Sequence, residues 1–304
     1  MKSKTGLLVE PQLTVVVPIY NEELTLPDVL PPLVKLCSQK NYRLLLIDDG
    51  SKDKTSNILD SYRNLPGIDI LHHKINRGYG SALKTGIIQT ETPYLVTFDG
   101  DGQHDPADIT KILDFALEKD ADLVIGTRST KIYGNWYREF GKSIIRKFSN
   151  LLIPFTIHDL NSGFKLYRSD FAKKYIRLCP DSMSFSEVIT LIFINQRNMV
   201  LEYPIAIKHR MAGKSTIRTF TAFETILEII NIVMLFNPLR IFIPVSVSCI
   251  LVGLIWGIPF VLMGRGVSVG SMLAIVAGLL FFTIGLIASQ LSAIRMGMLD
   301  QKDE

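Results

Sequence analysis

The chain has 304 residues, of which 47% are hydrophobic and 20% are charged. This length suits one large domain or two modest ones, and the composition excludes an intrinsically disordered chain. The formal net charge of +4 is too mild to indicate a protein that binds nucleic acid. A mean hydropathy of +0.25 is unusual for a purely soluble enzyme, so one part of the chain must hold an excess of apolar residues.

The first part of the chain alternates short apolar runs with segments of helical length. Polar residues, glycine or proline bound each run, which is the pattern of buried parallel strands. The runs are Leu13 to Ile19, Tyr42 to Asp48, Ile68 to His72, Tyr94 to Phe98 and Asp122 to Gly126. The alternation predicts an α/β fold with a mostly parallel sheet and helices on both faces. Ligands of such folds bind beyond the carboxyl ends of the strands, so we expect the chemistry there.

The segment after the fifth run is less regular. It predicts a helix around Trp136 to Leu152, a loop from His158 to Phe164, a helix near Ser186 to Asn195 and a strand near Val200 to Ile207.

The clearest chemical signal follows the fourth predicted strand. There Asp99 and Asp101 flank Gly100, and Gln103 comes next. Carboxylate and amide oxygens are hard ligands, so this turn predicts a site for Mg²⁺ or Mn²⁺, and its glycines let a phosphate approach the backbone. Zinc is not expected, because the turn has no cysteine and only one histidine. A bare Asp-x-Asp is also common in ordinary turns, and its position at a strand end favours the metal site.

The first two predicted strands also end in polar turns. Asp48 ends the second run and Asp49 follows it, and a carboxylate there can bind the ribose or base of a nucleotide. Asp49 and Ser51 would equally suit a turn with a helix N-cap. Tyr20 and Glu22 follow the first run. Three such strand ends together predict a ligand-binding edge of the sheet.

A glycine-containing segment, NRGYGSAL at residues 76 to 83, carries two of the three glycines of a dinucleotide fingerprint. It does not follow the first strand, and Leu83 replaces the last glycine, so we exclude a dinucleotide-dependent dehydrogenase. We expect Gly78 and Gly80 to allow close packing at the start of a helix.

Basic residues that suit phosphate groups lie in two places. Arg128 follows the fifth run, and Arg210 and Lys214 lie in a glycine-containing loop at residues 208 to 215. Guanidinium forks match phosphate oxygens, and this loop could close over a diphosphate or contact an anionic lipid headgroup. Simple positive charge beside a membrane is the alternative.

The apolar excess lies at the end of the chain. Residues 241 to 264 and 266 to 294 contain no charged side chain, and each stretch exceeds the roughly 20 residues that cross a bilayer. We therefore predict a two-helix membrane anchor with a short tail in residues 240 to 304, rather than a buried core hairpin. Residues 218 to 239 have a broad apolar face, which predicts an interfacial helix on the membrane. We expect residues 1 to 217 to form the remaining domain, and the acid-rich strand ends make it the candidate catalytic domain.

The charge pattern predicts how the anchor is oriented. Two spans leave both ends of the chain on one side, and the basic residues before the first span favour the cytoplasmic side of the cell membrane. Gly253 and Gly257 form a small-residue spacing on the first span that would pack helices within one chain or between the chains of a homo-oligomer.

Eight segments in this order resemble one known family. They are VVVPIYNEE, LLIDDGSKDKT, NRGYGSALKTG, FDGDGQHDP, VIGTR, DLNSGFKLYR, FSE and KHRMAGKST. The order is similar to that of the family 2 glycosyltransferases of GT-A fold, and more narrowly to the membrane-associated polyprenyl-phosphate glycosyltransferases related to dolichol-phosphate mannose synthase. The likeness covers about residues 13 to 217, and the two trailing spans fit a subset of that family.

The resemblance implies a role for each matched residue. The base and ribose of the sugar nucleotide would contact Pro18, Tyr20, Glu22 and Asp48, and the metal site would be Asp99, Asp101 and Gln103, with Gly100 packed against the nucleotide. The phosphate-binding positions match Arg128, Arg210 and Lys214, and Asp159 matches an acid near the acceptor. Glu187 lies where relatives with hydroxyl acceptors keep a Glu-Asp pair, but here Val188 follows it.

The implied reaction is the metal-dependent, inverting transfer of one sugar from a UDP- or GDP-sugar to polyprenyl phosphate, undecaprenyl or dolichyl, at the cytoplasmic membrane face. One alternative keeps the fold and donor but uses a hydroxyl acceptor in glycan synthesis. An alternative of another class is a non-catalytic membrane scaffold that only binds nucleotide. The intact acids in all the matched motifs speak against it.

Overall fold

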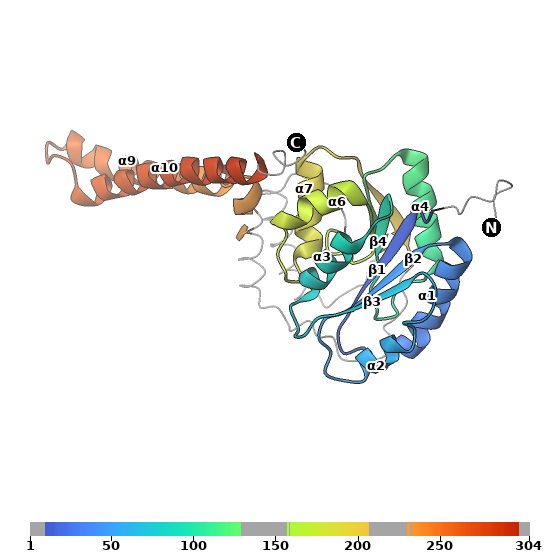
Figure 1. Ribbon diagram of the computed structural model, residues 1–304. Coiled ribbons are helices and arrows are strands. Elements are labelled where there is room, and N and C mark those ends of the chain that lie inside the picture. Colours follow the sequence, from blue (N-terminus) through green and yellow to red (C-terminus); the bar gives the residue numbers. More distant parts are fainter. Residues whose placement is uncertain (1–9, 129–156, 158, 207–229, 232, 298–304) are drawn as a thin grey trace. The chain divides into compact units, whose positions relative to one another are not determined.

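The computed structural model describes residues 10–128, 157, 159–206, 230–231 and 233–297 (Figure 1). The chain divides into two compact units. The first lies within residues 1–133 and 157–216, and the second within residues 134–156 and 217–304.

A seven-stranded mixed sheet forms the centre of the first unit, with the strand order β3-β2-β1-β4-β6-β5-β7. The strands are β1 Leu13–Ile19, β2 Arg43–Asp48, β3 Ile68–His72, β4 Tyr94–Thr97, β5 Leu123–Arg128, β6 Lys165–Arg168 and β7 Val200–Ile205. Strand β6 runs antiparallel to both neighbours, β4 and β5, and the other pairs are parallel. The predicted α/β fold with a mostly parallel sheet is therefore confirmed.

The predicted bounds of β1 and β3 match the observed ones, those of β2, β4, β5 and β7 differ by one or two residues at one or both ends, and β6 was not predicted. Its four residues begin with Lys165 and end with Arg168. A short segment with a basic residue at each end has no apolar alternation, so nothing in the sequence distinguished it from the loop before it.

Helices cover both faces of this sheet (Figure 1). They are α1 Leu26–Lys40, α2 Thr55–Asp60, α3 Tyr79–Gln89, α4 Ala107–Lys119, α6 Ser169–Tyr175 and α7 Phe185–Asn195, with the 3₁₀ helix η1 Ile176–Leu178. The helix predicted near Ser186 to Asn195 is thus confirmed, whereas the one predicted around Trp136 to Leu152 lies outside the described residues.

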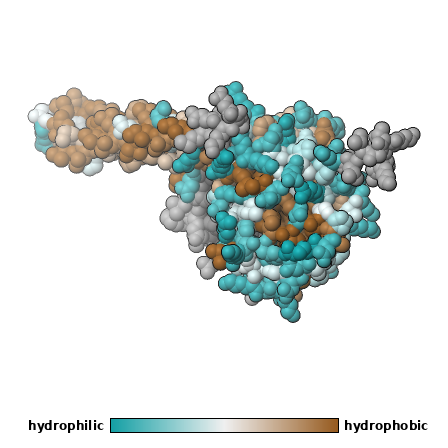
Figure 2. Space-filling model, viewed as in Figure 1, coloured by the Kyte–Doolittle hydropathy of each residue, from teal (hydrophilic) through white to brown (hydrophobic). Residues whose placement is uncertain are grey.

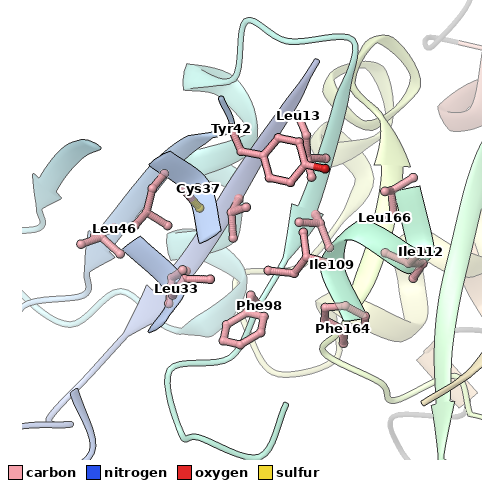
Figure 3. Close-up of a cluster of buried hydrophobic side chains, with 14 of the residues drawn as sticks. Leu13, Leu33, Cys37, Tyr42, Leu46, Phe98, Ile109, Ile112, Phe164 and Leu166 are labelled. Atoms are coloured by element: carbon pink, nitrogen blue, oxygen red, sulfur yellow. The ribbon is translucent and has the colours of Figure 1, made fainter. Parts of the chain in front are cut away.

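Side chains alternate along each strand, so each face of the sheet builds its own core. On one face Leu13, Val15 and Val17 pack with apolar residues of α1 and α4. Figure 3 shows part of this cluster, with Leu13, Leu33 and Ile109 labelled. On the other face Val16 points at α3, where a Cβ at Gly86 would lie 2.3 Å from Val16 Cγ1. Glycine at this position lets the helix lie directly on the sheet.

The described part of the second unit is dominated by a hairpin of two long apolar helices, α9 Leu239–Leu262 and α10 Val269–Gly297. Each contains a stretch with a mean hydropathy of 2.4 and is long and apolar enough to cross a membrane. The two predicted apolar spans are therefore present as helices, and Figure 2 shows their brown, hydrophobic surface.

Small residues form the contact between these two helices. A Cβ at Gly253 would lie 2.9 Å from the Ser271 carbonyl oxygen, and one at Gly278 would lie 2.5 Å from Ile250 Cγ1. The predicted small-residue spacing thus packs helices within one chain. Residues 230, 231 and 233–236, before the hairpin, are helical, and residues 218–229 of the predicted interfacial helix lie outside the described range.

Candidate active site

A pocket of about 620 Å³ lies at the carboxyl ends of β1, β2 and β3. It is lined by Tyr20, Asp48, Gly50, Ser51, Lys52, Ser56, Asp60, His72, His73, Lys74, Ile75 and Asn76. This volume is in the range of small-molecule sites. Gly50 is needed for its shape, because its φ is +69° and a Cβ there would lie 2.5 Å from the Ile75 carbonyl carbon.

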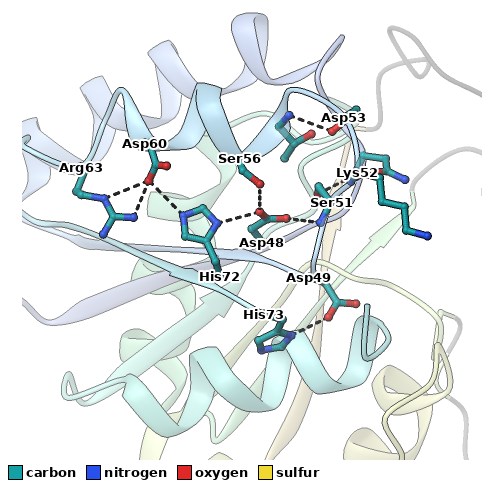
Figure 4. Close-up of polar contacts among 12 residues, drawn as sticks. Asp48, Asp49, Ser51, Lys52, Asp53, Ser56, Asp60, Arg63, His72 and His73 are labelled. Atoms are coloured by element: carbon teal, nitrogen blue, oxygen red, sulfur yellow. Dashed lines mark hydrogen bonds and ion pairs between the residues drawn. The ribbon is translucent and has the colours of Figure 1, made fainter. Parts of the chain in front are cut away.

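Asp48 is the buried acid of this pocket (Figure 4). Its carboxylate accepts hydrogen bonds from the Ser51 backbone N–H at 3.0 Å and from the Ser56 hydroxyl, and it lies 2.9 Å from His72 Nδ1. Burial by itself raises the pKa of Asp48, but the hydrogen bonds together outweigh it, so the pKa lies below its ordinary value. Asp48 is therefore a carboxylate at neutral pH and a fixed negative charge in the pocket wall.

Asp49 points the other way and organises the neighbouring loop. It accepts hydrogen bonds from the backbone N–H groups of Arg77 at 3.0 Å and Gly78 at 2.8 Å, and His73 Nδ1 lies 2.7 Å from it. Asp49 is not among the residues that line the pocket. Of the two predicted nucleotide-binding acids, the structure thus brings Asp48 to the pocket and uses Asp49 to hold the β3–α3 loop.

The loop that Asp49 holds leads into the two glycines at the start of α3. A Cβ at Gly78 would lie 2.5 Å from the Asp181 carbonyl oxygen, and one at Gly80 would lie 2.5 Å from the Pro180 carbonyl oxygen. The prediction that these glycines serve close packing is confirmed. They seat the start of α3 on the segment that leads into α7.

The predicted metal-binding turn directly follows β4. Tyr79 donates its hydroxyl hydrogen to Asp99 Oδ1 at 3.1 Å, and a Cβ at Gly163 would lie only 2.1 Å from Asp99 Oδ2. The Asp99 carboxylate therefore lies directly against the backbone of the β5–β6 connection. Asp101 Oδ1 accepts the Gln103 backbone N–H at 3.1 Å, which shapes the turn.

The donor groups in this turn fit Mg²⁺ or Mn²⁺. Two carboxylates and an amide are all oxygen donors, and Mg²⁺ is commonly held by one or two carboxylates while substrate phosphates and water complete its shell. Over the described residues no group of three or more His, Cys, Asp or Glu side chains could hold a metal ion by itself.

Thr25 links the first strand end to the predicted metal-binding turn, and its role was not predicted. Its buried hydroxyl lies 2.6 Å from Glu22 Oε2 and 3.3 Å from the Gly100 carbonyl oxygen. Pro18 is buried within β1, where it is the register partner of Ile47. Of the residues predicted at this strand end, Tyr20 is the one that lines the pocket.

Lys165, the first residue of β6, was also missed. Its side chain is fully buried, and its ammonium donates to the Leu160 carbonyl oxygen at 2.7 Å, the Ser186 carbonyl oxygen at 2.6 Å and Thr190 Oγ1 at 2.9 Å. Burial lowers the pKa of Lys165, and the attraction of Glu187, Asp159 and Asp99 opposes that shift. A single lysine directly after the predicted loop from His158 to Phe164 gave no sequence signal for this role.

The side chains of the three predicted phosphate-binding residues all lie outside the described part of the structure. Arg128 is the last residue of β5, in register with Ile205, and its side chain lies outside the described part. Arg210 and Lys214 also lie outside the described residues.

Solved glycosyltransferases share this fold. Glucosyl-3-phosphoglycerate synthase from Mycobacterium tuberculosis, solved with Mn²⁺ and UDP-glucose, superposes with a TM-score of 0.57 at 16% identity over 73% of this chain and 80% of that one. TarS 1–349 from S. aureus gives a TM-score of 0.55 at 18% identity over 75% of this chain and 65% of that one. The first unit therefore has a GT-A-like glycosyltransferase fold.

Two family models match the chain. Residues 14–176 match the glycosyl transferase family 2 model, and residues 237–294 match the GtrB C-terminal hairpin model. The protein belongs to glycosyl transferase family 2.

Curated relatives extend the comparison. Polyprenol monophosphomannose synthase from Mycolicibacterium smegmatis is 30% identical over 66% of this chain and 79% of its own length. Undecaprenyl-phosphate 4-deoxy-4-formamido-L-arabinose transferase from Proteus mirabilis is 27% identical, over 67% of this chain and 62% of the relative. Dolichyl-phosphate beta-glucosyltransferase from Dictyostelium discoideum is 33% identical, over 53% of this chain and 55% of the relative. The chain thus spans less than two thirds of the latter two relatives.

Proposed function

We propose that this protein transfers one sugar from a UDP- or GDP-sugar to polyprenyl phosphate at the cytoplasmic face of the membrane, with inversion at the anomeric carbon. The observation that carries the proposal is that relatives named for different sugars are all named for a polyprenyl-type lipid phosphate acceptor. The apolar hairpin supports it, because a long lipid tail leaves the bilayer only at about 0.8 kcal/mol per CH₂ group.

On the donor side, the pocket at the ends of β1 to β3 would hold the nucleoside. Tyr20 and the ionised Asp48 line it, and Asp48 is fixed by Ser51, Ser56 and His72, so it would meet the ligand already oriented. Asp99, Asp101 and Gln103 would hold Mg²⁺ or Mn²⁺, which supplies charge neutralisation to a diphosphate leaving group. Arg128, Arg210 and Lys214 would add fixed positive charge to the same phosphates.

On the acceptor side, little proton transfer is needed. A phosphate monoester with a second pKa near 6 is largely anionic at neutral pH, so it is already a nucleophile. The protein's task is then to orient this anion and to exclude water. Asp159, in the loop before β6, is the acid we assign to the acceptor side.

The test uses the full-length chain in lipid nanodiscs with polyprenyl phosphate, radiolabelled UDP- and GDP-sugars and Mn²⁺. We expect label in an acid-labile lipid fraction, and we expect Asp101→Ala to abolish it at unchanged expression. Glu118→Ala is the matched control, because this exposed acid pairs with Lys119 on α4, outside the site. Near-normal turnover by Asp101→Ala would refute the metal role.

A hydroxyl acceptor is the second candidate, and one observation favours it. Glu187 lies in the first turn of α7, within electrostatic reach of Lys165, where a carboxylate could serve as a base. In that case Glu187→Gln would abolish transfer and the labelled product would be acid-stable. A nucleotide-binding scaffold would instead bind donor and transfer nothing.

A further inference from the structure

Strand β6 brings a distant segment to the edge of the sheet that holds the metal-binding turn. Because β6 is antiparallel to β4, its first residue, Lys165, is in register with Thr97 at the carboxyl end of β4. The Thr97 hydroxyl donates to the Gly163 carbonyl oxygen at 2.6 Å and accepts the Lys165 backbone N–H at 3.2 Å. The loop that carries Asp159 therefore ends at Lys165, which lies opposite Thr97, and Asp99 follows Thr97 by two residues.

The Lys165 side chain connects β6 to two other elements, the Asp159 loop and α7. Its ammonium binds the Leu160 carbonyl of the Asp159 loop, and the Ser186 carbonyl and Thr190 hydroxyl of α7. Thr190 donates its own hydrogen to the Ser186 carbonyl oxygen at 2.8 Å, so its oxygen faces Nζ as an acceptor. Three acceptors match the three hydrogens of a charged ammonium.

Burial and charge explain why a lysine is needed at this position. A fully buried ammonium is costly unless it is hydrogen-bonded and faces opposite charge. Here Glu187, Asp159 and Asp99 supply that charge. The Lys165 cation in turn offsets the repulsion among these three carboxylates. Without it, those acids would repel one another and an approaching phosphate.

We propose that Lys165 is a positioning residue for the acceptor half of the site, which holds the Asp159 loop and the first turn of α7 as one unit beside the Asp99 turn. This inference rests on the proposed transfer to a lipid phosphate. It assigns Lys165 no contact with either substrate.

The first test compares substrate parameters in Lys165→Met, which keeps the length of the side chain and removes the charge and donors. Displacing acceptor-side groups by about 1 Å costs about 100-fold in rate, so we expect kcat/KM for polyprenyl phosphate to fall by about that factor. Affinity for the nucleoside diphosphate should change less than about twofold, because its pocket lies at β1 to β3. Equal losses for both substrates, or none for the acceptor, would overturn the proposal.

A matched pair at Thr190 keeps the test decisive if Lys165→Met does not fold. Thr190→Val removes the hydroxyl that Lys165 binds and keeps the shape, whereas Thr190→Ser keeps the hydroxyl. We expect kcat/KM for the acceptor to be highest in the wild type, lower in Thr190→Ser and lowest in Thr190→Val. A purely structural role would lower the amount of folded protein and leave the acceptor KM of both variants equal to that of the wild type.

Hydrogen exchange separates the failure of this inference from that of the proposed function. Thr190→Val should speed exchange in residues 159–164 and 185–190 and leave β1 to β3 unchanged. If the wild type transfers no sugar to polyprenyl phosphate, the proposed function fails whatever the exchange shows. If the wild type transfers sugar and exchange in those two segments is unaltered, the positioning role fails alone.

Discussion

The sheet domain and the helical hairpin have opposite interiors. The first unit buries large apolar side chains such as Leu33 and Phe98, which are 0% exposed. The hairpin buries Ser246, Gly253 and Gly278 and turns its large side chains outward, with Ile255 at 73% exposed and Leu262 at 81%. Water drives large apolar groups inward, whereas in lipid the apolar groups gain nothing by burial and helices associate through small residues. The contrast indicates that the two units are built for different solvents.

The same substitution in both units gives the largest expected effect. Ile125→Ala in β5 removes a fully buried side chain and should lower the free energy of unfolding by about 2 to 5 kcal/mol. Ile255→Ala in α9 removes an outward-facing one and should change stability by less than about 0.5 kcal/mol. Denaturation of the detergent-solubilised chain, followed by near-ultraviolet circular dichroism, measures both. Similar losses would show that the outward face of α9 is packed against protein.

Replacing a buried glycine of the hairpin with a larger residue tests whether small residues hold α9 and α10 together. A Cβ at Gly278 would lie 2.9 Å from the Ser246 carbonyl oxygen, so Gly278→Val should separate α9 from α10 and cost about 1 to 3 kcal/mol. Gly270→Val is the control on the same helix, since a Cβ there meets nothing nearer than 3.7 Å. Disulfide crosslinking of cysteine pairs across the hairpin reports the separation. Equal crosslinking in both variants would contradict this packing.

The smallest expected effect concerns the polar network of the sheet domain. Because the pKa of Asp48 is lowered in the folded state, its carboxylate stabilises the fold above the ordinary aspartate pKa, and this contribution disappears as the pH falls through the folded-state value. Asp48→Asn should therefore cost about 1 kcal/mol at pH 7 and progressively less on acidification below about pH 4. Thermal unfolding of both proteins from pH 7 to pH 3 measures the difference. A stability difference between the two proteins that increased as the pH fell would contradict the lowered pKa of Asp48.

Much of the fold could be predicted because its signals are local. The strand runs, the acid-rich turns and the two apolar spans each occupy one short stretch of chain, and the structure contains the corresponding strands, turns and helices. The packing role of Gly78 and Gly80 was also predictable. The dinucleotide fingerprint is incomplete, so close packing at the start of a helix was the remaining role for these glycines. The roles of the predicted site residues in binding and catalysis stay predictions that the variants above address.

The features that could not be predicted depend on partners distant in the chain. Asp48 and Asp49 are adjacent, yet one lines the pocket and the other holds the β3–α3 loop, because successive side chains point in opposite directions. Thr25 reaches Gly100 across 75 positions of sequence. No local pattern records such a contact.

By itself, the order of residues determined where six of the seven strands form, where acids cluster and which helices are apolar enough to enter lipid. These features depend on periodicity and composition over short stretches of chain. The tertiary structure alone decided that β6 inserts antiparallel between β4 and β5. That insertion buries Lys165 among acceptors from α7 and the Asp159 loop. A charge is stable inside a protein only when folding assembles all its partners at once, and those partners come from separate stretches of chain.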